Sequence, residues 1–309
     1  MRKPIGIGIV GVGKIARDQH LPALAANSAY SLLAAVSRQP MPAGTPVFAS
    51  LEDMIAATPT MCAVSLCTPP SVRSALARTA LAAGLHVMLE KPPGQSVSEV
   101  ADLERRALQK GVSLFASWHS REAAGVETAR LWLAARRIER VDIAWHEDVR
   151  VWHPGQLWLW QPGGLGVFDP GINALSIATR ILPEPLIVES AMLDFPINRE
   201  TPIAAELRLL HGAAPCVAAS FNFRHSGAER WDIDIQTDMG RLLLSRGGAE
   251  LRLNGEPLPT VADAEYPALY RRFARLIAAG ACDVDLRPLQ LVADAFLCGS
   301  RRLVAAFDP

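Results

Sequence analysis

Acidic, imidazole and indole side chains are concentrated in one central stretch of the sequence. Glu147, Trp152 and His153 stand close together, and further tryptophans flank them. An aromatic face can cover the C–H surface of a small molecule while acids, amides and imidazoles bond its hydroxyls. This composition is typical of a site for a hydroxyl-rich ligand such as a sugar. The candidate residues for this ligand are His119, Glu147, Trp152, His153 and Trp231. For Trp231, packing between protein segments is an equal alternative.

Lys91 is a candidate functional residue because of its place after a predicted strand. It stands in Glu90-Lys91-Pro92, directly after a strand-like apolar run, and Thr68-Pro69 follows another such run. Ligands of open α/β sheets bind at the carboxyl ends of the strands. A lysine at that edge, held by a rigid proline, can act on a ligand, although an ordinary surface lysine is an equal alternative for Lys91 alone.

A glycine-rich turn follows the first strand-like run. The residues Gly11-Val12-Gly13-Lys14-Ile15-Ala16 match the GxGxxA fingerprint between a strand and a helix. The first glycine permits the tight turn, the second lets the backbone approach a pyrophosphate, and the helix amides face the phosphates. The sequence therefore predicts a dinucleotide-binding turn.

Ser37 and Arg38 follow the second predicted strand, where a dinucleotide fold meets the adenosine ribose. A site selective for NAD usually has an acid there. Serine and arginine can bond a 2′-phosphate, so NADP is preferred over NAD in this interpretation, with a chance surface arginine as the alternative. The candidate cofactor-binding residues are Gly11, Gly13, Lys14, Ile15, Ser37, Arg38, Thr68, Pro69, Glu90 and Lys91.

The elements that position these residues follow two different patterns. Up to about residue 120, strand-like runs alternate with helical segments, among them one from Ser96 to Gly111 that opens with the capping box Ser96-Glu99. This alternation predicts βαβ units and a parallel sheet. We therefore expect a dinucleotide-binding Rossmann domain over residues 1–120.

Beyond residue 120 the pattern predicts an α+β substrate-binding domain over residues 121–309. A helix is expected over 122–137, then consecutive strands, with a tight turn at Asn254-Gly255. Consecutive strands joined by hairpins predict an open, mostly antiparallel sheet. Helices are expected again over 267–279 and 288–307, and the C-terminal helix can pack back on the first domain.

Composition excludes several classes of protein. The 309 residues carry 31 basic and 31 acidic side chains, so no basic excess points to nucleic acid. No stretch approaches the roughly 18 apolar residues that a membrane span requires. The N-terminus lacks a cleavage site of the secretory type, which favours the cytoplasm. Five cysteines without a CxxC pair predict neither a disulfide framework nor a metal site.

The motifs IVGVGKIA, CTPP and LEKP, followed by Asp169-Pro170-Gly171-Ile172-Asn173, resemble the glucose-fructose oxidoreductase/inositol dehydrogenase (Gfo/Idh/MocA) family. The resemblance covers essentially the whole chain. It implies catalytic roles for Lys91 and Asp169 and places Asn173 where many members have histidine. Asparagine cannot relay a proton near neutral pH, so proton transfer is expected to rest on Lys91 and Asp169. Asn173 is then expected to bind substrate by orienting a hydroxyl.

Within the family the chain most resembles the bacterial aldose 1-dehydrogenases. That resemblance implies oxidation of the anomeric C1 hydroxyl of L-arabinose first, and of D-galactose, to the lactone. The alternatives are a related dehydrogenase for an inositol, a polyol or a trans-dihydrodiol, and a non-catalytic sugar or NADP sensor. A small-molecule sugar is the expected partner, with neither nucleic acid nor membrane, and the family analogy points to a homodimer.

Overall fold

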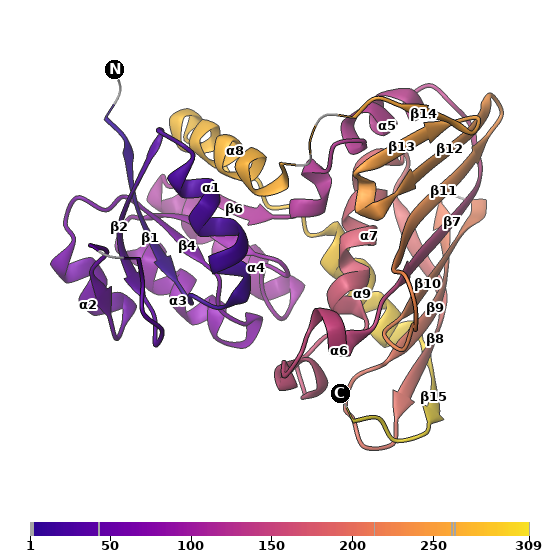
Figure 1. Cartoon of the computed structure of the whole chain (residues 1–309), viewed down its shortest axis with the longest axis horizontal. Coiled ribbons are helices and arrows are strands. Elements are labelled where there is room, and N and C mark those ends of the chain that lie inside the picture. The colour runs from indigo at the N-terminus through magenta and orange to yellow at the C-terminus, as the bar shows by residue number, and fades with distance from the viewer. Residues whose placement is uncertain (1–2, 43, 213, 261, 263, 309) are drawn as a thin grey trace. The chain divides into compact units, whose positions relative to one another are not determined.

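A six-stranded parallel sheet forms the centre of the first of two structural units. The computed structural model describes residues 3–42, 44–212, 214–260, 262 and 264–308. Unit 1 comprises residues 1–119 and 265–286, and unit 2 comprises residues 120–264 and 287–309 (Figure 1). The strands of unit 1 are β1 (Ile5–Val10), β2 (Tyr30–Val36), β3 (Val47–Phe48), β4 (Ala63–Leu66), β5 (His86–Glu90) and β6 (Leu114–Ser117).

The strand order of this sheet is β3-β2-β1-β4-β5-β6, and neighbouring strands run parallel. This is the order of the doubly wound dinucleotide-binding fold. The helical elements of unit 1 are η1 (Ala16–His20), α1 (Leu21–Ala25), α2 (Leu51–Ala57), α3 (Pro70–Ala82), α4 (Val97–Lys110) and α8 (Glu265–Ala279). The parallel sheet and its helices confirm the predicted Rossmann fold.

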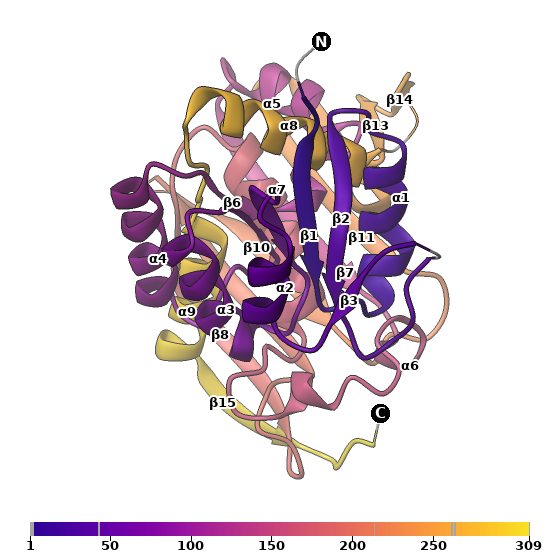
Figure 2. The same cartoon turned by 90° about the vertical axis from the view of Figure 1, so that its left-hand side faces the viewer.

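Apolar side chains cover both faces of the sheet in unit 1. One core joins α2, α3 and α4 to the strands through residues such as Met54, Leu81 and Leu103. The other joins α1 and α8 to the opposite face through Leu24, Tyr270 and other buried side chains (Figure 2). The helix α4 begins as expected, because the Ser96 side chain accepts a hydrogen bond from the backbone N–H of Glu99.

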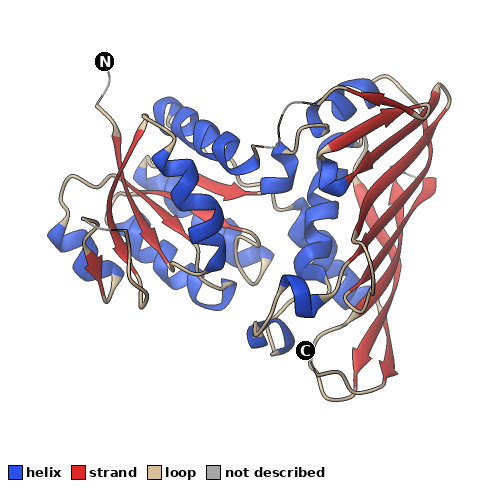
Figure 3. Ribbon diagram, in the orientation of Figure 1, coloured by secondary structure: helices blue, strands red, loops and turns tan. Residues whose placement is uncertain are grey.

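Unit 2 is built on a nine-stranded sheet with helices packed against it (Figure 3). Its order is β14-β13-β12-β11-β7-β10-β9-β8-β15; β7–β10 and β8–β15 are parallel, and the other pairings are antiparallel. The strands are β7 (Ile138–His146), β8 (Leu186–Pro196), β9 (Ala204–His211), β10 (Ala214–Asn222), β11 (Arg230–Thr237), β12 (Gly240–Ser245), β13 (Glu250–Leu253), β14 (Glu256–Leu258) and β15 (Ser300–Val304). The expected mostly antiparallel sheet is confirmed.

The helical elements of unit 2 include α7, a long helix that the sequence pattern did not reveal. They are α5 (Val126–Leu133), α6 (Val149–Trp152), η3 (Leu157–Trp160), α7 (Phe168–Ile181), η4 (Arg246–Gly248) and α9 (Arg287–Cys298), and η2 (His119–Glu122) lies at the chain boundary between the units. The helix α7 begins with Phe168-Asp169-Pro170 and is buried along most of its length. It therefore gives Asp169 and Asn173 a rigid helical support.

Two helix predictions in this part of the chain need correction. The expected helix over 122–137 is the shorter α5, which begins after Gly125, whose backbone N–H donates to the carbonyl of Gly248. The expected helix over 288–307 ends at Cys298, and the chain continues as β15. Parallel pairing of β15 with β8 overrides the local helical pattern there. Among the described residues no helix is long and apolar enough to cross a membrane.

Candidate active site

Gly11 and Gly13 open the loop after β1, and they are glycine for different reasons. Gly11 has a φ of +86°, and a Cβ there would lie 2.8 Å from Cγ2 of Thr68. The fold itself therefore requires Gly11. A Cβ on Gly13 would meet no atom within 4 Å. Glycine at position 13 fits instead the close approach of a ligand to the backbone, as a pyrophosphate requires.

Thr68 stands opposite this glycine loop. It follows β4, and β1 lies between β4 and β2 in the sheet, so the two loops flank the point where the strand order reverses. Dinucleotides bind at this point in doubly wound folds. The Oγ1 atom of Thr68 is buried and has no hydrogen-bond partner within the described part of the chain. A polar group of a bound cofactor would satisfy it, so the residues present fit a dinucleotide.

Five more candidate cofactor residues lie after β1, β2 and β4, and all but the half-buried Ser37 are exposed. Ser37 Oγ donates a hydrogen bond to the backbone carbonyl of Gln39 and accepts one from its N–H, which shapes the turn that carries the exposed Arg38. Lys14 forms an ion pair with Asp18. Ile15 and Pro69 are exposed. Their contacts with a dinucleotide, and a preference for NADP, stay predictions.

Arg73 joins two loops at the carboxyl edge of the sheet. Its buried guanidinium, on α3, donates to the backbone carbonyls of Thr68, Glu90 and Pro92. These carbonyls belong to the loop after β4 and to the loop that carries Lys91. Arginine presents several donors in a rigid fork, so one side chain can hold both loops. Arg73 therefore fixes the backbone on both sides of Lys91.

The side chain of Glu90 holds Lys91 from within the unit. Its carboxylate is 4% exposed and accepts hydrogen bonds from three groups. Oε2 accepts from the backbone N–H of Lys91 at 2.8 Å, while Oε1 accepts from the hydroxyl of Tyr266 at 2.8 Å and contacts Nε2 of His20 at 3.1 Å. Glu90 was predicted to bind cofactor; that role stays a prediction, and the structure shows its carboxylate in an internal network.

Glu90 and His20 form a buried ion pair. Burial would raise the pKa of Glu90, but the hydrogen bond and charge of His20 hold it at about 2. Burial would lower the pKa of His20, but Cys67, Tyr270 and Glu90 raise it well above its ordinary value. Nδ1 of His20 lies 2.8 Å from the hydroxyl of Tyr270. Both partners of the pair are therefore charged at neutral pH.

His119, a candidate substrate residue, belongs to unit 1 and faces the same network. Its Nδ1 lies 2.6 Å from Oε2 of Glu265, and its ring stacks on Tyr266 with centroids 5.5 Å apart. Burial would lower the pKa of His119, but Glu265 raises it overall, against the opposing charge of Lys91. The carboxylate of Glu265 thus favours the charged form of the His119 imidazole.

Glu147 organises the candidate residues of unit 2. It follows β7 and is buried, and its two carboxylate oxygens have different partners. Oε2 accepts from the indole N–H of Trp231 at 2.9 Å, and Oε1 lies 3.2 Å from Nε2 of His153. The indole of Trp231 is therefore held in place by the acid, and its role as a sugar contact stays a prediction.

His153 connects Glu147 to Asp169. The buried Asp169 lies in the first turn of α7, and its Oδ2 is 3.7 Å from Nδ1 of His153. That distance exceeds a hydrogen bond, and Nδ1 is buried without a hydrogen-bond partner among the described residues. A ligand hydroxyl would satisfy it. Asn173 lies one helical turn beyond Asp169 and is half-buried, with its carbonyl accepting from Ser176 Oγ at 2.7 Å.

Three indole rings stand next to this acid and imidazole cluster. Trp231 stacks on Trp145 with centroids 6.1 Å apart and meets the edge of Trp152 at 4.9 Å. The indole N–H of Trp152 donates to Glu229 at 3.1 Å, and its ring is 41% exposed. The structure therefore brings together Glu147, Trp152, His153, Asp169 and Trp231 in unit 2, with the additional partner Glu229.

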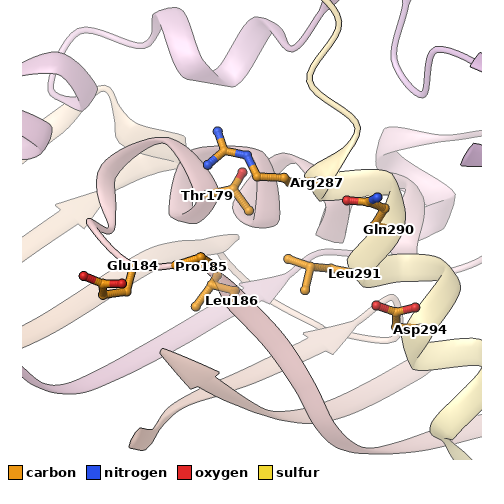
Figure 4. Close-up of a pocket in the computed structure, with 8 residues that line it drawn as sticks. All are labelled: Thr179, Glu184, Pro185, Leu186, Arg287, Gln290, Leu291 and Asp294. Carbon is orange, nitrogen blue, oxygen red and sulfur yellow. The ribbon is translucent and has the colours of Figure 1, made fainter. Parts of the chain in front are cut away.

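A pocket of about 350 Å³ elsewhere in unit 2 contains none of the candidate residues. It is lined by Thr179, Glu184, Pro185, Leu186, Arg287, Gln290, Leu291 and Asp294. Figure 4 shows the carboxylates of Glu184 and Asp294 at opposite ends, with apolar side chains between them. Its groups do not converge on one reacting atom. The candidate residues lie instead in the strand-end loops of unit 1 and, within unit 2, in the Glu147–His153–Asp169 cluster.

His20, Arg73 and Tyr266 contact Glu90 in the structure but were not candidates from the sequence. Their roles depend on contacts with Glu90 and its loop, and Tyr266 comes from α8, far along the chain. Arg73 left a local signal, because it shares the buried face of α3 with Ala77 and Ala80. An arginine on an apolar helix face needs internal acceptors. In the described part of the chain no cluster of three or more acids, histidines or cysteines could hold a metal.

The sheet order, the glycine turn and the lysine at the strand edge define a dinucleotide-binding oxidoreductase. Residues 5–117 match the model of the oxidoreductase family with an NAD-binding Rossmann fold, GFO_IDH_MocA. The chain is 46% identical over 306 residues to galactose 1-dehydrogenase from Pseudomonas fluorescens, with 99% of each chain covered. The chain belongs to the Gfo/Idh/MocA family of oxidoreductases, which confirms the resemblance.

Solved structures agree with this assignment. The crystal structure of a D-galactose-1-dehydrogenase from Rhizobium etli matches with a TM-score of 0.96 and 52% identity, over 100% of this chain and 99% of that one. A 3-ketoreductase from Actinomadura kijaniata, solved with NADP and TDP-benzene, matches with a TM-score of 0.83 at 18% identity, over 98% of this chain and 100% of that chain. The second likeness supports the fold alone.

Proposed function

We propose that the chain is an NAD(P)-dependent aldose 1-dehydrogenase that oxidises the anomeric C1 hydroxyl of D-galactose and L-arabinose to the lactone. Two relatives of nearly full-length similarity, at 46% and 52% identity, are galactose dehydrogenases. Their similarity extends through unit 2, which carries most of the candidate sugar residues. It therefore supports a shared class of substrate as well as a shared fold.

The observation that carries this proposal is the Glu147–His153–Trp231 arrangement beside Asp169. Glu147 orients the imidazole and the indole through its two oxygens, and the buried Nδ1 of His153 has no hydrogen-bond partner among the residues that the structure describes. A site that bonds hydroxyls in fixed directions discriminates between sugars better than an apolar pocket. Asn173, His119 and Trp152 are the further proposed sugar contacts.

The loops of unit 1 are proposed to hold the dinucleotide. Gly11 and Gly13 present the loop backbone, Lys14 and Ile15 begin the helix, and Thr68 Oγ1 offers a buried hydroxyl. Ser37 and Arg38 would bond a 2′-phosphate, so we propose that NADP is preferred. When bound, the dinucleotide supplies the hydride acceptor.

The proton of the C1 hydroxyl is proposed to pass to Nζ of Lys91, with assistance from Asp169. Loss of this proton and of the C1 hydride leaves a C1 carbonyl, which is the lactone. Arg73 and Glu90 hold the backbone on both sides of Lys91, so its position does not depend on the ligand. Asn173 would orient a hydroxyl without carrying a proton.

The configuration of the sugar ring predicts which aldoses the proposed site accepts. D-Galactose and L-arabinose share their ring configuration and differ by the exocyclic CH₂OH. D-Glucose has the opposite C4 configuration, which would leave one buried polar partner without its hydroxyl, at about 1–3 kcal/mol. The site should therefore accept the first two sugars and discriminate against the third.

The proposal is tested by incubating the purified enzyme with D-galactose and either cofactor. The account expects NAD(P)H to form together with a lactone, which hydroxylamine traps as the hydroxamate. Lys91→Ala should lower kcat by roughly two to four decades while NADP binding is retained. Lactone formation at a near-normal rate by Lys91→Ala would remove Lys91 from the mechanism.

A further inference from the structure

The buried groups behind Lys91 are more polar than the core that contains them. Glu90, His20 and Tyr266 are almost inaccessible, and Tyr266 and Tyr270 belong to an apolar cluster of unit 1. Removing a carboxylate from water costs several kcal/mol unless its hydrogen bonds are replaced, and an apolar core of the same volume is often at least as stable. Stability alone therefore does not explain why these polar groups are buried behind Lys91.

Within the described residues, the side-chain hydrogen bonds of Glu90 connect His20 and Tyr266 to one candidate residue, Lys91. One carboxylate oxygen accepts from the backbone N–H of Lys91, and the other accepts from Tyr266 and contacts His20. If Tyr266 or His20 were lost, the carboxylate could rotate about its side-chain bonds and release the N–H of Lys91. The hydroxyl of Tyr266 and the imidazole of His20 thus restrict the backbone of Lys91 through the carboxylate of Glu90.

We propose that Tyr266 and His20 are positioning residues for Lys91, acting through the carboxylate of Glu90. The inference rests on the proposed role of Lys91 in proton transfer. It also assigns a function to the segment 265–286, which returns to unit 1 after the chain has formed most of unit 2. The first turns of α8 supply the hydroxyl that holds the strand end of β5 in register for catalysis.

A matched pair of phenylalanine variants tests the proposal. Tyr266→Phe removes the hydrogen bond to Glu90, whereas Tyr30→Phe removes the bond from Tyr30 to the backbone carbonyl of Tyr270 at 2.9 Å. Both tyrosines are buried in the same cluster, so similar falls in Tm are expected. A misplaced catalytic group costs up to about a hundredfold in rate. We expect Tyr266→Phe to lower kcat roughly ten- to hundredfold, and Tyr30→Phe to change it less than about twofold.

A double-mutant cycle with Lys91→Ala separates positioning from a general structural role. If Tyr266 acts through Lys91, Tyr266→Phe should change the residual kcat of Lys91→Ala by less than about twofold. The same loss in both backgrounds, or equal kcat losses in Tyr266→Phe and Tyr30→Phe, would overturn the inference while leaving the role of Lys91 intact. A near-normal kcat for Lys91→Ala alone would instead refute the proposed function and the inference with it.

His20→Gln provides the second variant. Glutamine keeps an N–H donor for Glu90 but removes the positive charge, so kcat should fall less than in His20→Ala, again only when Lys91 is present. Equal kcat values for the two His20 variants and the wild type would contradict the proposal. The sugar KM and the Kd for NADP should stay within about twofold, because neither residue is proposed to touch a ligand.

Discussion

Nδ1 of His153 lies 3.7 Å from Oδ2 of Asp169, so an imidazole reaches this acid from outside the helix that carries it. The family resemblance places a histidine of many members one turn further along this helix, at the position of Asn173. The loop after α6 supplies an imidazole to the acid instead, and Glu147 fixes its orientation through Nε2. The Asp169 site therefore retains an imidazole neighbour despite the asparagine.

His153→Ala should lower kcat/KM for D-galactose by about one to two decades. The variant loses a proposed sugar contact and leaves Glu147 with one fewer partner, and a hydrogen bond to a charged group contributes about 1.5–3 kcal/mol. Steady-state kinetics measures the loss. The control is His225→Gln, because Nε2 of His225 lies 2.9 Å from the backbone carbonyl of Ala228 and is not a proposed sugar contact. Equal effects of the two variants would argue against a specific role for His153.

Arg38→Ala should weaken NADP much more than NAD. A charge-assisted contact with the 2′-phosphate contributes roughly 1.5–3 kcal/mol, or about one to two decades in Kd. Titrating the enzyme into NADPH or NADH and following the fluorescence of the reduced nicotinamide measures both affinities. If the two Kd values rise by the same factor, Arg38 does not read the phosphate.

Arg73→Lys should destabilise unit 1 and weaken cofactor binding. An ammonium cannot reproduce the fork that reaches the carbonyls of Thr68, Glu90 and Pro92, and each buried acceptor left without a donor costs about 1–3 kcal/mol. Thermal unfolding with and without NADP measures both effects. Arg78→Lys is the matched control on the same helix, because Arg78 pairs with Asp102 at the surface. Equal falls in Tm for the two variants would show that the three carbonyls do not depend on Arg73.

The ion pair between His119 and Glu265 should make stability depend on pH. The pKa of His119 is raised in the folded chain, so its contribution to stability is complete below the unfolded value of about 6.5 and is lost as pH rises through the folded value. Thermal unfolding from pH 5 to 9 should show the difference in Tm between wild type and His119→Gln shrinking as pH rises. A difference that grows above pH 6.5 would mean that burial, not Glu265, determines this pKa.

Local sequence signals predicted the elements that depend on local chemistry. The Ser96-Glu99 cap, the Gly11–Ala16 turn and the tight turn at Asn254-Gly255, where φ is +51° and +88°, all occur as expected. The strand β15 was mistaken for helix because its conformation depends on pairing with β8. Such pairing is a property of distant segments and leaves no local pattern.

The candidate site was predictable to a similar degree. Glu147 and His153 were candidates because unusual side chains lie close together in sequence, whereas Asp169 was a candidate through the family resemblance. The structure adds that Glu147 joins His153 to Trp231. Tyr266 and His20 could not be identified, since a lone tyrosine or histidine in an apolar pattern is most often part of the core. Their proposed roles depend on contacts with the carboxylate of Glu90, to which three separate segments of the chain contribute partners.

If this chain oxidises galacto-configured aldoses at C1, a comparison of kcat/KM across four substrates with NADP will show it. The substrates are D-galactose, L-arabinose, D-glucose and myo-inositol. We expect activity on D-galactose and L-arabinose, with kcat/KM for D-glucose lower by about one to two decades because one buried partner loses its hydroxyl. D-Glucose equal to or better than both sugars, or myo-inositol exceeding all three, would contradict it.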